Sequence, residues 1–199
     1  MDDALIDVIA KNGKVLKIHR YPHPAHKRCD FEENEPPRHR GQIRALFQKL
    51  RETIPGVVLR TSIIAGLPGE GEPEFEELCA FLREAKIERA GVFPYSPEEG
   101  TPAAAMERVD EETAAHRAEL IMEIQAGIMD AYNQSRIGKT VKVLCEGFQE
   151  ENGLYYGRSY AESPTSNGTI FFSGKEIKPG NFYDVTLTKD LDGDMYGEK

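Results

Sequence analysis

The sequence predicts an α/β segment followed by a small antiparallel β-barrel. Two observations predict the first part: strand-like runs alternate with amphipathic helical stretches, and the runs Val57–Ala65 and Gly91–Tyr95 both break off into loops rich in Gly and Pro. After Gly138 the pattern changes to short alternating strands separated by Asn-Gly and Pro-Gly turns. We therefore expect two domains, residues 1–136 and residues 137–199.

Helices and strands alternate along the first segment in the order typical of parallel βα units. Helical periodicity predicts one helix at Ala4–Lys11 and another over residues 41–54, which Pro55-Gly56 terminates. A third helix is expected from Pro73, and a long fourth one after Asp110, whose carboxylate can cap it. The predicted strands are Val15–Ile18, Val57–Ala65 and Gly91–Tyr95.

Four strands are predicted in the second segment, and the turns between them carry Asn152-Gly153, Asn167-Gly168 and Pro179-Gly180. Such turns favour hairpins and therefore antiparallel pairing. The predicted strands are Thr140–Glu146, Leu154–Ala161, Thr169–Phe172 and Phe182–Leu187.

The net charge indicates the kind of partner, and the cysteine content argues against a disulfide-stabilised protein. The 199 residues carry a net charge of −9, which disfavours non-specific attraction to phosphate backbones and favours a basic protein partner. The three cysteines, Cys29, Cys79 and Cys145, are too scattered for a disulfide framework or a CxxC metal site. The sequence has no signal peptide and no apolar run of about 18 residues, so we expect a cytoplasmic protein with no membrane association.

Four strings then carry a resemblance to a known family. TSIIAGLPGE, GVFPYSPEEGTPAA, GKTVKVLCEG and GRSYAESP, in this order and spacing, resemble the C-terminal half of the RimO-type ribosomal protein methylthiotransferases. The resemblance implies the later part of a TIM-like radical S-adenosylmethionine barrel, followed by an OB-like β-barrel called a TRAM domain. Members of that family attach a methylthio group to an aspartate of the twelfth small-subunit ribosomal protein.

The chemistry implied by the resemblance needs S-adenosylmethionine and two [4Fe–4S] clusters held by thiolates. The radical cluster requires a CxxxCxxC motif, and no two cysteines of this chain are close enough in sequence to form one. We therefore expect a fragment of such an enzyme that is inactive alone, with no catalytic residue and no metal ligand of its own.

Two other functions stay open at this point. Related tRNA methylthiotransferases share the barrel strings, although YSPEEGTP and GRSYAESP are more similar to the ribosomal-protein enzymes. The chain could also be a non-enzymatic TRAM-type module that binds RNA or a ribosomal partner.

The resemblance also implies which residues bind the cofactor. Gly66, Pro68, Gly69 and Glu70 would line the S-adenosylmethionine edge of the sheet together with Tyr95, and a plain βα turn is the structural alternative. The family usually has a Thr after GLPGE, and Thr is a good helix cap. This chain has Gly71 there, which leaves open how the backbone starts the following helix.

Ile18–Arg38 departs from the family and is rich in His and Pro. His19, His23, His26 and Cys29 have the spacing of zinc ligands. A second hypothesis fits better: with a permissible choice of codons, residues 20–37 shifted by one base spell DIPIQHISDAILKKMNR, which resembles the family's barrel segment. This stretch would then be an aberrant insert produced by two compensating frame shifts.

In the second domain, Arg158 and Tyr160 are the predicted substrate contacts. They belong to a basic and aromatic cluster of the kind with which OB-like barrels stack RNA bases. However, residues 137–199 hold 7 Lys or Arg and 10 Asp or Glu, a net charge near −3. That balance favours a basic small-subunit ribosomal protein as the partner, with RNA as the alternative.

Overall fold

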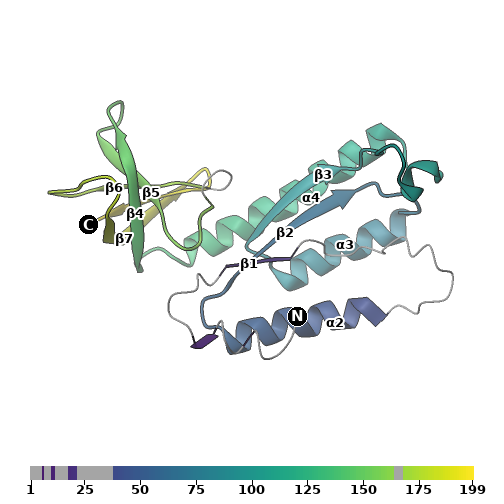
Figure 1. Cartoon of the computed structure of the whole chain (residues 1–199), viewed down its shortest axis with the longest axis horizontal. Helices are drawn as coiled ribbons and strands as arrows, with labels where there is room; N and C mark the ends of the chain where they lie inside the picture. Colours follow the sequence, from purple (N-terminus) through teal and green to yellow (C-terminus); the bar gives the residue numbers. More distant parts are fainter. Residues whose placement is uncertain (1–5, 7–9, 12–17, 22–37, 164–167) are drawn as a thin grey trace. The chain divides into compact units, whose positions relative to one another are not determined.

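The computed structural model describes residues 6, 10–11, 18–21, 38–163 and 168–199. It contains two compact units, of which the first reaches Ile128 and the second consists mainly of Met129–Lys199. The first is a short sheet with helices and the second is a β-barrel (Figure 1). Among the described helices, none has the length and apolar composition of a bilayer-spanning segment.

The sheet of the first unit has the strand order β1-β2-β3, and β2 and β3 are parallel. Their register runs from Arg60 opposite Arg89 to Ala65 opposite Pro94, so both strands end at the same edge of the sheet. The bounds are β1 Ile18–Tyr21, β2 Val58–Ala65, β3 Arg89–Pro94, α2 Arg38–Thr53, α3 Glu72–Ala85, the 3₁₀ helix η1 Pro102–Ala105 and α4 Glu111–Gln134.

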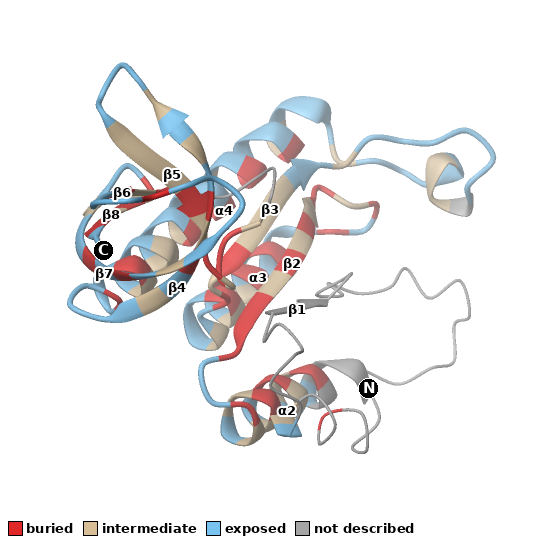
Figure 2. Ribbon diagram, turned by 60° about the vertical axis from the view of Figure 1, so that its left-hand side comes forward, coloured by how far each residue is buried: buried red, intermediate tan, exposed pale blue. Residues whose placement is uncertain are grey.

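One face of this sheet packs against helices. Along β2 the side chains of Thr61, Ile63 and Ala65 are buried, and they alternate with partly exposed ones, as the pleat of a strand requires. Figure 2 shows these buried positions in red along β2 and in patches on the helices. The core side chains contributed by these three helices are Ile43, Phe47 and Leu50 of α2, Phe75, Leu78, Cys79 and Leu82 of α3, and Ala118 and Ile121 of α4.

Helix α3 begins as predicted although Gly71 supplies no capping side chain. Gly71 has an extended backbone, with φ −84° and ψ −177°, and its N–H donates to Oε2 of Glu74 at 3.1 Å. Glu74 therefore satisfies one of the free backbone donors at the helix start. The change from Thr to Gly leaves the helix start intact.

The second unit is a closed five-stranded barrel with the order β4-β5-β6-β8-β7. Four of its five pairings are antiparallel, as predicted, whereas β6 and β8 pair in parallel and close the barrel. Its core contains Val143, Phe172, Val185 and Leu187. The strand bounds are β4 Thr140–Gln149, β5 Leu154–Arg158, β6 Ile170–Ser173, β7 Phe182–Leu191 and β8 Asp194–Glu198.

Strand β8 was absent from the sequence prediction, although the chain carries a signal for it. Asp192 and Gly193 both have positive φ, 53° and 84°, and they connect β7 to β8 as a two-residue hairpin turn. An Asp-Gly pair at this position is a strong hairpin signal because both residues tolerate the left-handed conformation.

Several predictions concern the N-terminal region. Ile6, Ala10 and Lys11 are helical, as the helix predicted at Ala4–Lys11 requires. Strand β1 shares only Ile18 with the predicted strand Val15–Ile18, whose other residues lie outside the described ones. Most of the insert also lies outside them, namely residues 22–37, and so do the proposed zinc ligands His23, His26 and Cys29.

Candidate functional site

The loop after β2 is a tight turn that follows directly from its Gly and Pro residues. Gly66 leaves the strand with φ +78°. Pro68 and Gly69, the latter with φ +79°, then form a turn in which the N–H of Glu70 donates to the carbonyl of Leu67 at 2.9 Å. Pro followed by a Gly of positive φ is the pattern of a type II turn.

Gly66 is required by packing as well as by its backbone angle. A Cβ built at this position would lie 2.4 Å from Cβ of Ala114 on α4. At Gly69, by contrast, a Cβ would meet no atom within 4 Å. The first glycine therefore packs against a helix, while the second leaves open space beside the strand edge.

The buried side chain of Glu70 stabilises this loop through hydrogen bonds. It is 6% exposed, and its Oε1 accepts from the N–H of Gly66 at 2.9 Å and from Nη1 of Arg117 at 3.0 Å. The same Nη1 donates to the backbone carbonyl of Glu70 at 2.8 Å, and the guanidinium lies over the ring of Phe75. Arg117, on α4, was missed by sequence reasoning because no local pattern links two residues 47 positions apart.

Tyr95 lies at the neighbouring strand end. Its N–H donates to the carbonyl of Ala65 at 2.8 Å, so the loops after β2 and β3 start side by side. Its hydroxyl is buried and has no hydrogen-bond partner among the described residues, and the same is true of Oε2 of Glu70. The predicted cofactor residues thus all come from adjacent loops at one edge of the sheet.

The loop after Tyr95 folds mainly through its own contacts. The hydroxyl of Thr101 donates to the carbonyl of Glu98 at 2.8 Å and accepts from the N–H of Ala104 at 3.3 Å, which caps η1. Glu98 and Glu99 are exposed. We therefore assign Thr101 a structural role.

Two features of this edge are of the kind that polar ligands use. Gly69 leaves open space, and the hydroxyl of Tyr95 and Oε2 of Glu70 are buried polar atoms without a hydrogen-bond partner among the described residues. Burial raises the pKa of the thiols of Cys79 and Cys145, which opposes the thiolate form that a cluster needs. Within the described residues, no group of three His, Cys, Asp or Glu side chains could hold a metal ion.

In the barrel, the two predicted substrate contacts occupy different environments. Arg158, the last residue of β5, forms an ion pair with Glu146 of β4, and the two side chains are 29% and 33% exposed. Tyr160 lies in the turn that follows β5 and is partly exposed.

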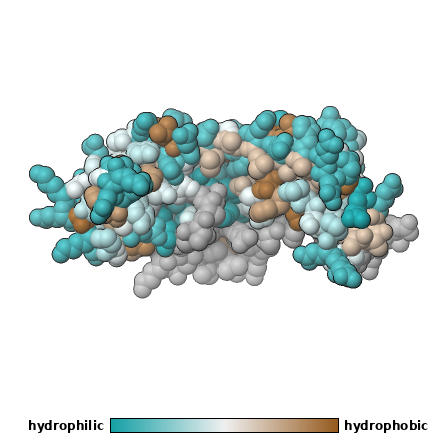
Figure 3. Space-filling model, turned by 90° about the horizontal axis from the view of Figure 1, so that it is seen from above, coloured by the Kyte–Doolittle hydropathy of each residue, from teal (hydrophilic) through white to brown (hydrophobic). Residues whose placement is uncertain are grey.

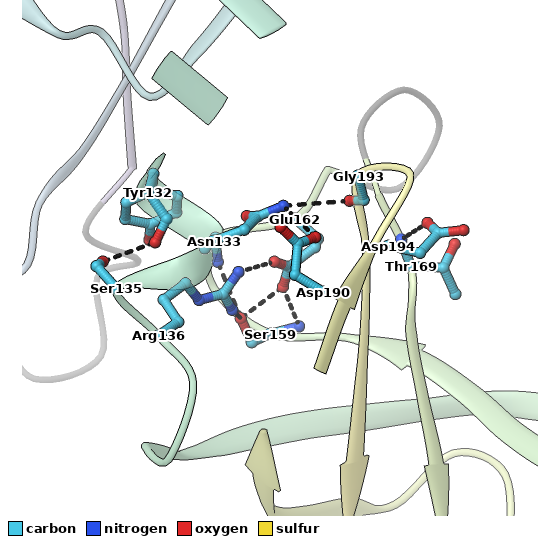
Figure 4. A network of polar contacts seen from close by, with 11 residues as sticks. Tyr132, Asn133, Ser135, Arg136, Ser159, Glu162, Thr169, Asp190, Gly193 and Asp194 are labelled. Carbon is cyan, nitrogen blue, oxygen red and sulfur yellow. Dashed lines mark hydrogen bonds and ion pairs between the residues drawn. The ribbon is translucent and has the colours of Figure 1, made fainter. Parts of the chain in front are cut away.

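Ser159 and Glu162 of the GRSYAESP string form a buried polar network with Arg136 (Figure 4). Nη1 of Arg136 donates to Oε1 of Glu162 at 2.5 Å, and Nη2 donates to Oγ of Ser159 at 3.1 Å. The hydroxyl and the N–H of Ser159 both donate to Oε2 of Glu162, at 2.6 and 2.9 Å. Sequence reasoning named the string but missed this network, because Arg136 lies 26 residues away from Glu162.

The end of α4 also holds the β7–β8 hairpin. Nδ2 of the fully buried Asn133 donates to Oδ1 of Asp190 at 3.3 Å and to the carbonyl of Gly193 at 3.4 Å. Figure 4 shows both sets of contacts side by side. The last turn of α4 and the turn that follows it are therefore a structural part of the barrel unit: Asn133 binds the β7–β8 hairpin, and Arg136 binds the segment after β5.

Electrostatics favour the ionised form of Glu162. Burial alone would raise the pKa of this carboxyl, but the Arg136 guanidinium and the two donors of Ser159 outweigh burial and hold it below its usual value. A carboxyl with a lowered pKa stabilises the folded state above its unfolded pKa, and that stabilisation is lost as the pH falls through the lowered pKa.

Substitution of the two glycines separates packing from backbone strain. We expect Gly66→Ala to lower the free energy of unfolding of the first unit by about 2–4 kcal/mol, because it adds a clash with Ala114 to the strain of a positive φ. Gly69→Ala, the matched control, adds strain alone and should cost about 1–2 kcal/mol. Urea unfolding followed by far-UV circular dichroism measures both. Equal losses in the two variants would contradict the packing role of Gly66.

Glu162→Gln tests the buried network through its pH dependence. At pH 7 we expect the variant to lose about 3–5 kcal/mol of barrel stability, because the Arg136 guanidinium is left buried and uncompensated. As the pH falls below the ordinary carboxyl pKa of 4.5 and through the lowered pKa of Glu162, wild type loses this stabilisation, so the difference between the two proteins should shrink. Thermal unfolding between pH 3 and pH 7 measures this. A difference that stays constant with pH would show that the carboxylate charge has no such role.

Comparisons with known proteins agree with this architecture. Residues 137–199 match the model of the TRAM domain family. A "Ribosomal protein uS12 methylthiotransferase RimO" of Caldanaerobacter subterraneus subsp. tengcongensis is 39% identical over 198 residues, which cover 98% of this chain and 45% of that relative. Proteins of the same name from Symbiobacterium thermophilum and Desulforamulus reducens are 40% identical over 98% of this chain, covering 41% and 45% of their own lengths.

The chain thus spans less than half the length of these curated relatives. The likeness includes the strand-edge loops of the first unit as well as the barrel. The chain is therefore similar, over almost its entire length, to the C-terminal region of the RimO-type ribosomal protein methylthiotransferases, and its residues 137–199 match the TRAM domain family.

Proposed function

We propose that this chain works as the C-terminal part of a radical S-adenosylmethionine methylthiotransferase that modifies an aspartate of a small-subunit ribosomal protein. The observation that carries the proposal is the identity of about 40% over 98% of the chain to proteins named as uS12 methylthiotransferases. In this proposal the first unit supplies one edge of the cofactor site, and the barrel docks the substrate protein. The chain is inactive by itself.

At the cofactor edge, we assign different tasks to the five predicted residues. Gly66, Pro68 and Glu70 shape the loop. Gly66 packs against α4, Pro68 initiates the turn, and Glu70 connects the turn to Arg117. Gly69 and Tyr95 face the ligand, the glycine through open space and the tyrosine through its unpaired hydroxyl. When S-adenosylmethionine is bound in such an enzyme, it supplies the radical and the methyl group.

The two [4Fe–4S] clusters of the family chemistry have to be held outside this chain. Its three cysteines are far apart in sequence, and burial disfavours the thiolate at Cys79 and Cys145. The contribution of this chain is therefore confined to binding and positioning. Action on a ribosomal protein is consistent with a cytoplasmic location, and no membrane is involved in this proposal.

For the partner, the charge of the barrel favours a basic protein over RNA. Residues 137–199 have 7 basic and 10 acidic side chains, and the guanidinium of Arg158 is already paired with Glu146. An RNA backbone would meet net repulsion, whereas a basic ribosomal protein would be attracted. In this proposal Arg158 and Tyr160 contribute to the contact surface of the barrel.

The experiment is a titration of the purified chain against ribosomal protein uS12 and, separately, against a tRNA anticodon stem-loop. We expect measurable binding to uS12 that weakens as the salt concentration rises, and weaker binding to the RNA at physiological salt. Isothermal calorimetry measures both. Tighter binding to the stem-loop would overturn the partner and favour the tRNA alternative.

The same preparation, treated with iron and sulfide, should hold no stoichiometric [4Fe–4S] cluster and should form no 5′-deoxyadenosine. A stable cluster that cleaves S-adenosylmethionine would show that the chain is active on its own.

A further inference from the structure

Among the large hydrophobic side chains of the described residues that reach the surface, Phe182 is the most exposed, at 63%. On the face drawn in Figure 3, hydrophobic residues form small separate patches within a mostly hydrophilic surface. A phenylalanine this exposed on a regular strand is unusual, because burial of an aromatic side chain contributes so much to stability. Its surroundings therefore indicate which kind of contact it could make.

Phe182 belongs to an apolar row on the outer side of the barrel. Leu144 of β4 lies directly opposite Phe182 of β7 and also opposite Arg158 of β5. The neighbours of Leu144 along β4, Val143 and Cys145, are fully buried in the barrel core. Because successive side chains of a strand point to opposite faces, Leu144 points outward and lies between Phe182 and Arg158.

Two ion pairs flank this row on the same outer side. Arg158 pairs with Glu146, and Nζ of Lys142 lies 3.4 Å from Oδ1 of Asp184 across β4 and β7. The Lys142–Asp184 pair is highly exposed, at 67% and 69%, so it lies at the rim. We call this set the β4 surface: Lys142, Leu144, Glu146, Arg158, Phe182 and Asp184.

We infer that the β4 surface is the docking surface of the barrel for a basic protein, with Phe182 and Leu144 as its apolar anchors. Protein interfaces typically have an apolar, often aromatic, centre within a polar rim. This inference rests on the proposed function and names the surface that would bind the substrate protein.

Charge decides between a protein and RNA as the occupant. Sites for single-stranded RNA combine aromatic rings with unpaired cations that follow the backbone. Both cations of the β4 surface, Lys142 and Arg158, are instead paired with carboxylates. The net charge of −3 over residues 137–199 attracts a basic protein from a distance, and the neutral, apolar centre allows close contact without burying an unpaired charge.

The test is Phe182→Ala in the full-length chain, titrated with purified uS12. We expect at least about tenfold weaker binding, the loss typical of a central aromatic anchor. Because Phe182 is mostly exposed, its truncation should leave the melting temperature of the barrel nearly unchanged, which thermal unfolding checks. Leu191→Ala is the matched control: Leu191 is 44% exposed at the other end of the same strand, about 30 Å away.

We expect the Leu191 variant to bind uS12 within twofold of wild type. Wild-type affinity in the Phe182 variant would overturn the assignment of the surface while leaving uS12 as the partner. If wild type itself fails to bind uS12, the proposed partner and this surface both fall. If the Phe182 variant loses affinity for the RNA stem-loop instead of uS12, the β4 surface is a site for RNA. The proposal of a basic protein as its partner is then wrong.

Discussion

The barrel unit depends on the buried ion pair between Arg136 and Glu162. Both side chains are almost fully buried, and Ser159 satisfies the second carboxylate oxygen of Glu162 with two hydrogen bonds. A buried pair of this kind stabilises a fold only when its remaining hydrogen bonds are satisfied, and loss of one partner costs about 3–5 kcal/mol. The pair fixes the segment after β5 to the end of α4. Together with Asn133 on the β7–β8 hairpin, it makes the last turn of α4 part of the barrel.

The loop after β2 also depends on a buried ion pair, although here Oε2 of Glu70 has no hydrogen-bond partner among the described residues. Glu70 and Arg117 form a second buried pair, which closes the turn of Gly66–Glu70 onto α4. In two of the strings that resemble the methylthiotransferases, a buried glutamate thus has an arginine partner in the fold. Gly69 and Phe182 are exposed, and the hydroxyl of Tyr95 is buried without a hydrogen-bond partner among the described residues; we propose ligand or partner contacts for these three residues.

Local sequence patterns predicted the alternation of helices and parallel strands, the adjacent strand ends and the barrel turns, because each depends on residues close in sequence. They did not reveal that Arg117 meets Glu70, or that Arg136 meets Glu162, since these pairs join residues 47 and 26 positions apart. The parallel pairing of β6 with β8 is likewise a long-range contact. The hairpin at Asp192-Gly193 was different, because its turn signal was local and was overlooked. The five cofactor residues and the two contacts Arg158 and Tyr160 stay predictions.

A comparison of two pieces of the chain tests most directly whether the end of α4 belongs to the barrel. Residues 129–199 retain Arg136 and Asn133, whereas residues 137–199, the range of the TRAM match, lack both. We expect the longer piece to unfold cooperatively, and the shorter one to be less stable by at least about 3 kcal/mol, because Glu162 loses its counter-charge. Urea unfolding at pH 7 measures the difference. Equal stability of the two pieces would contradict the account.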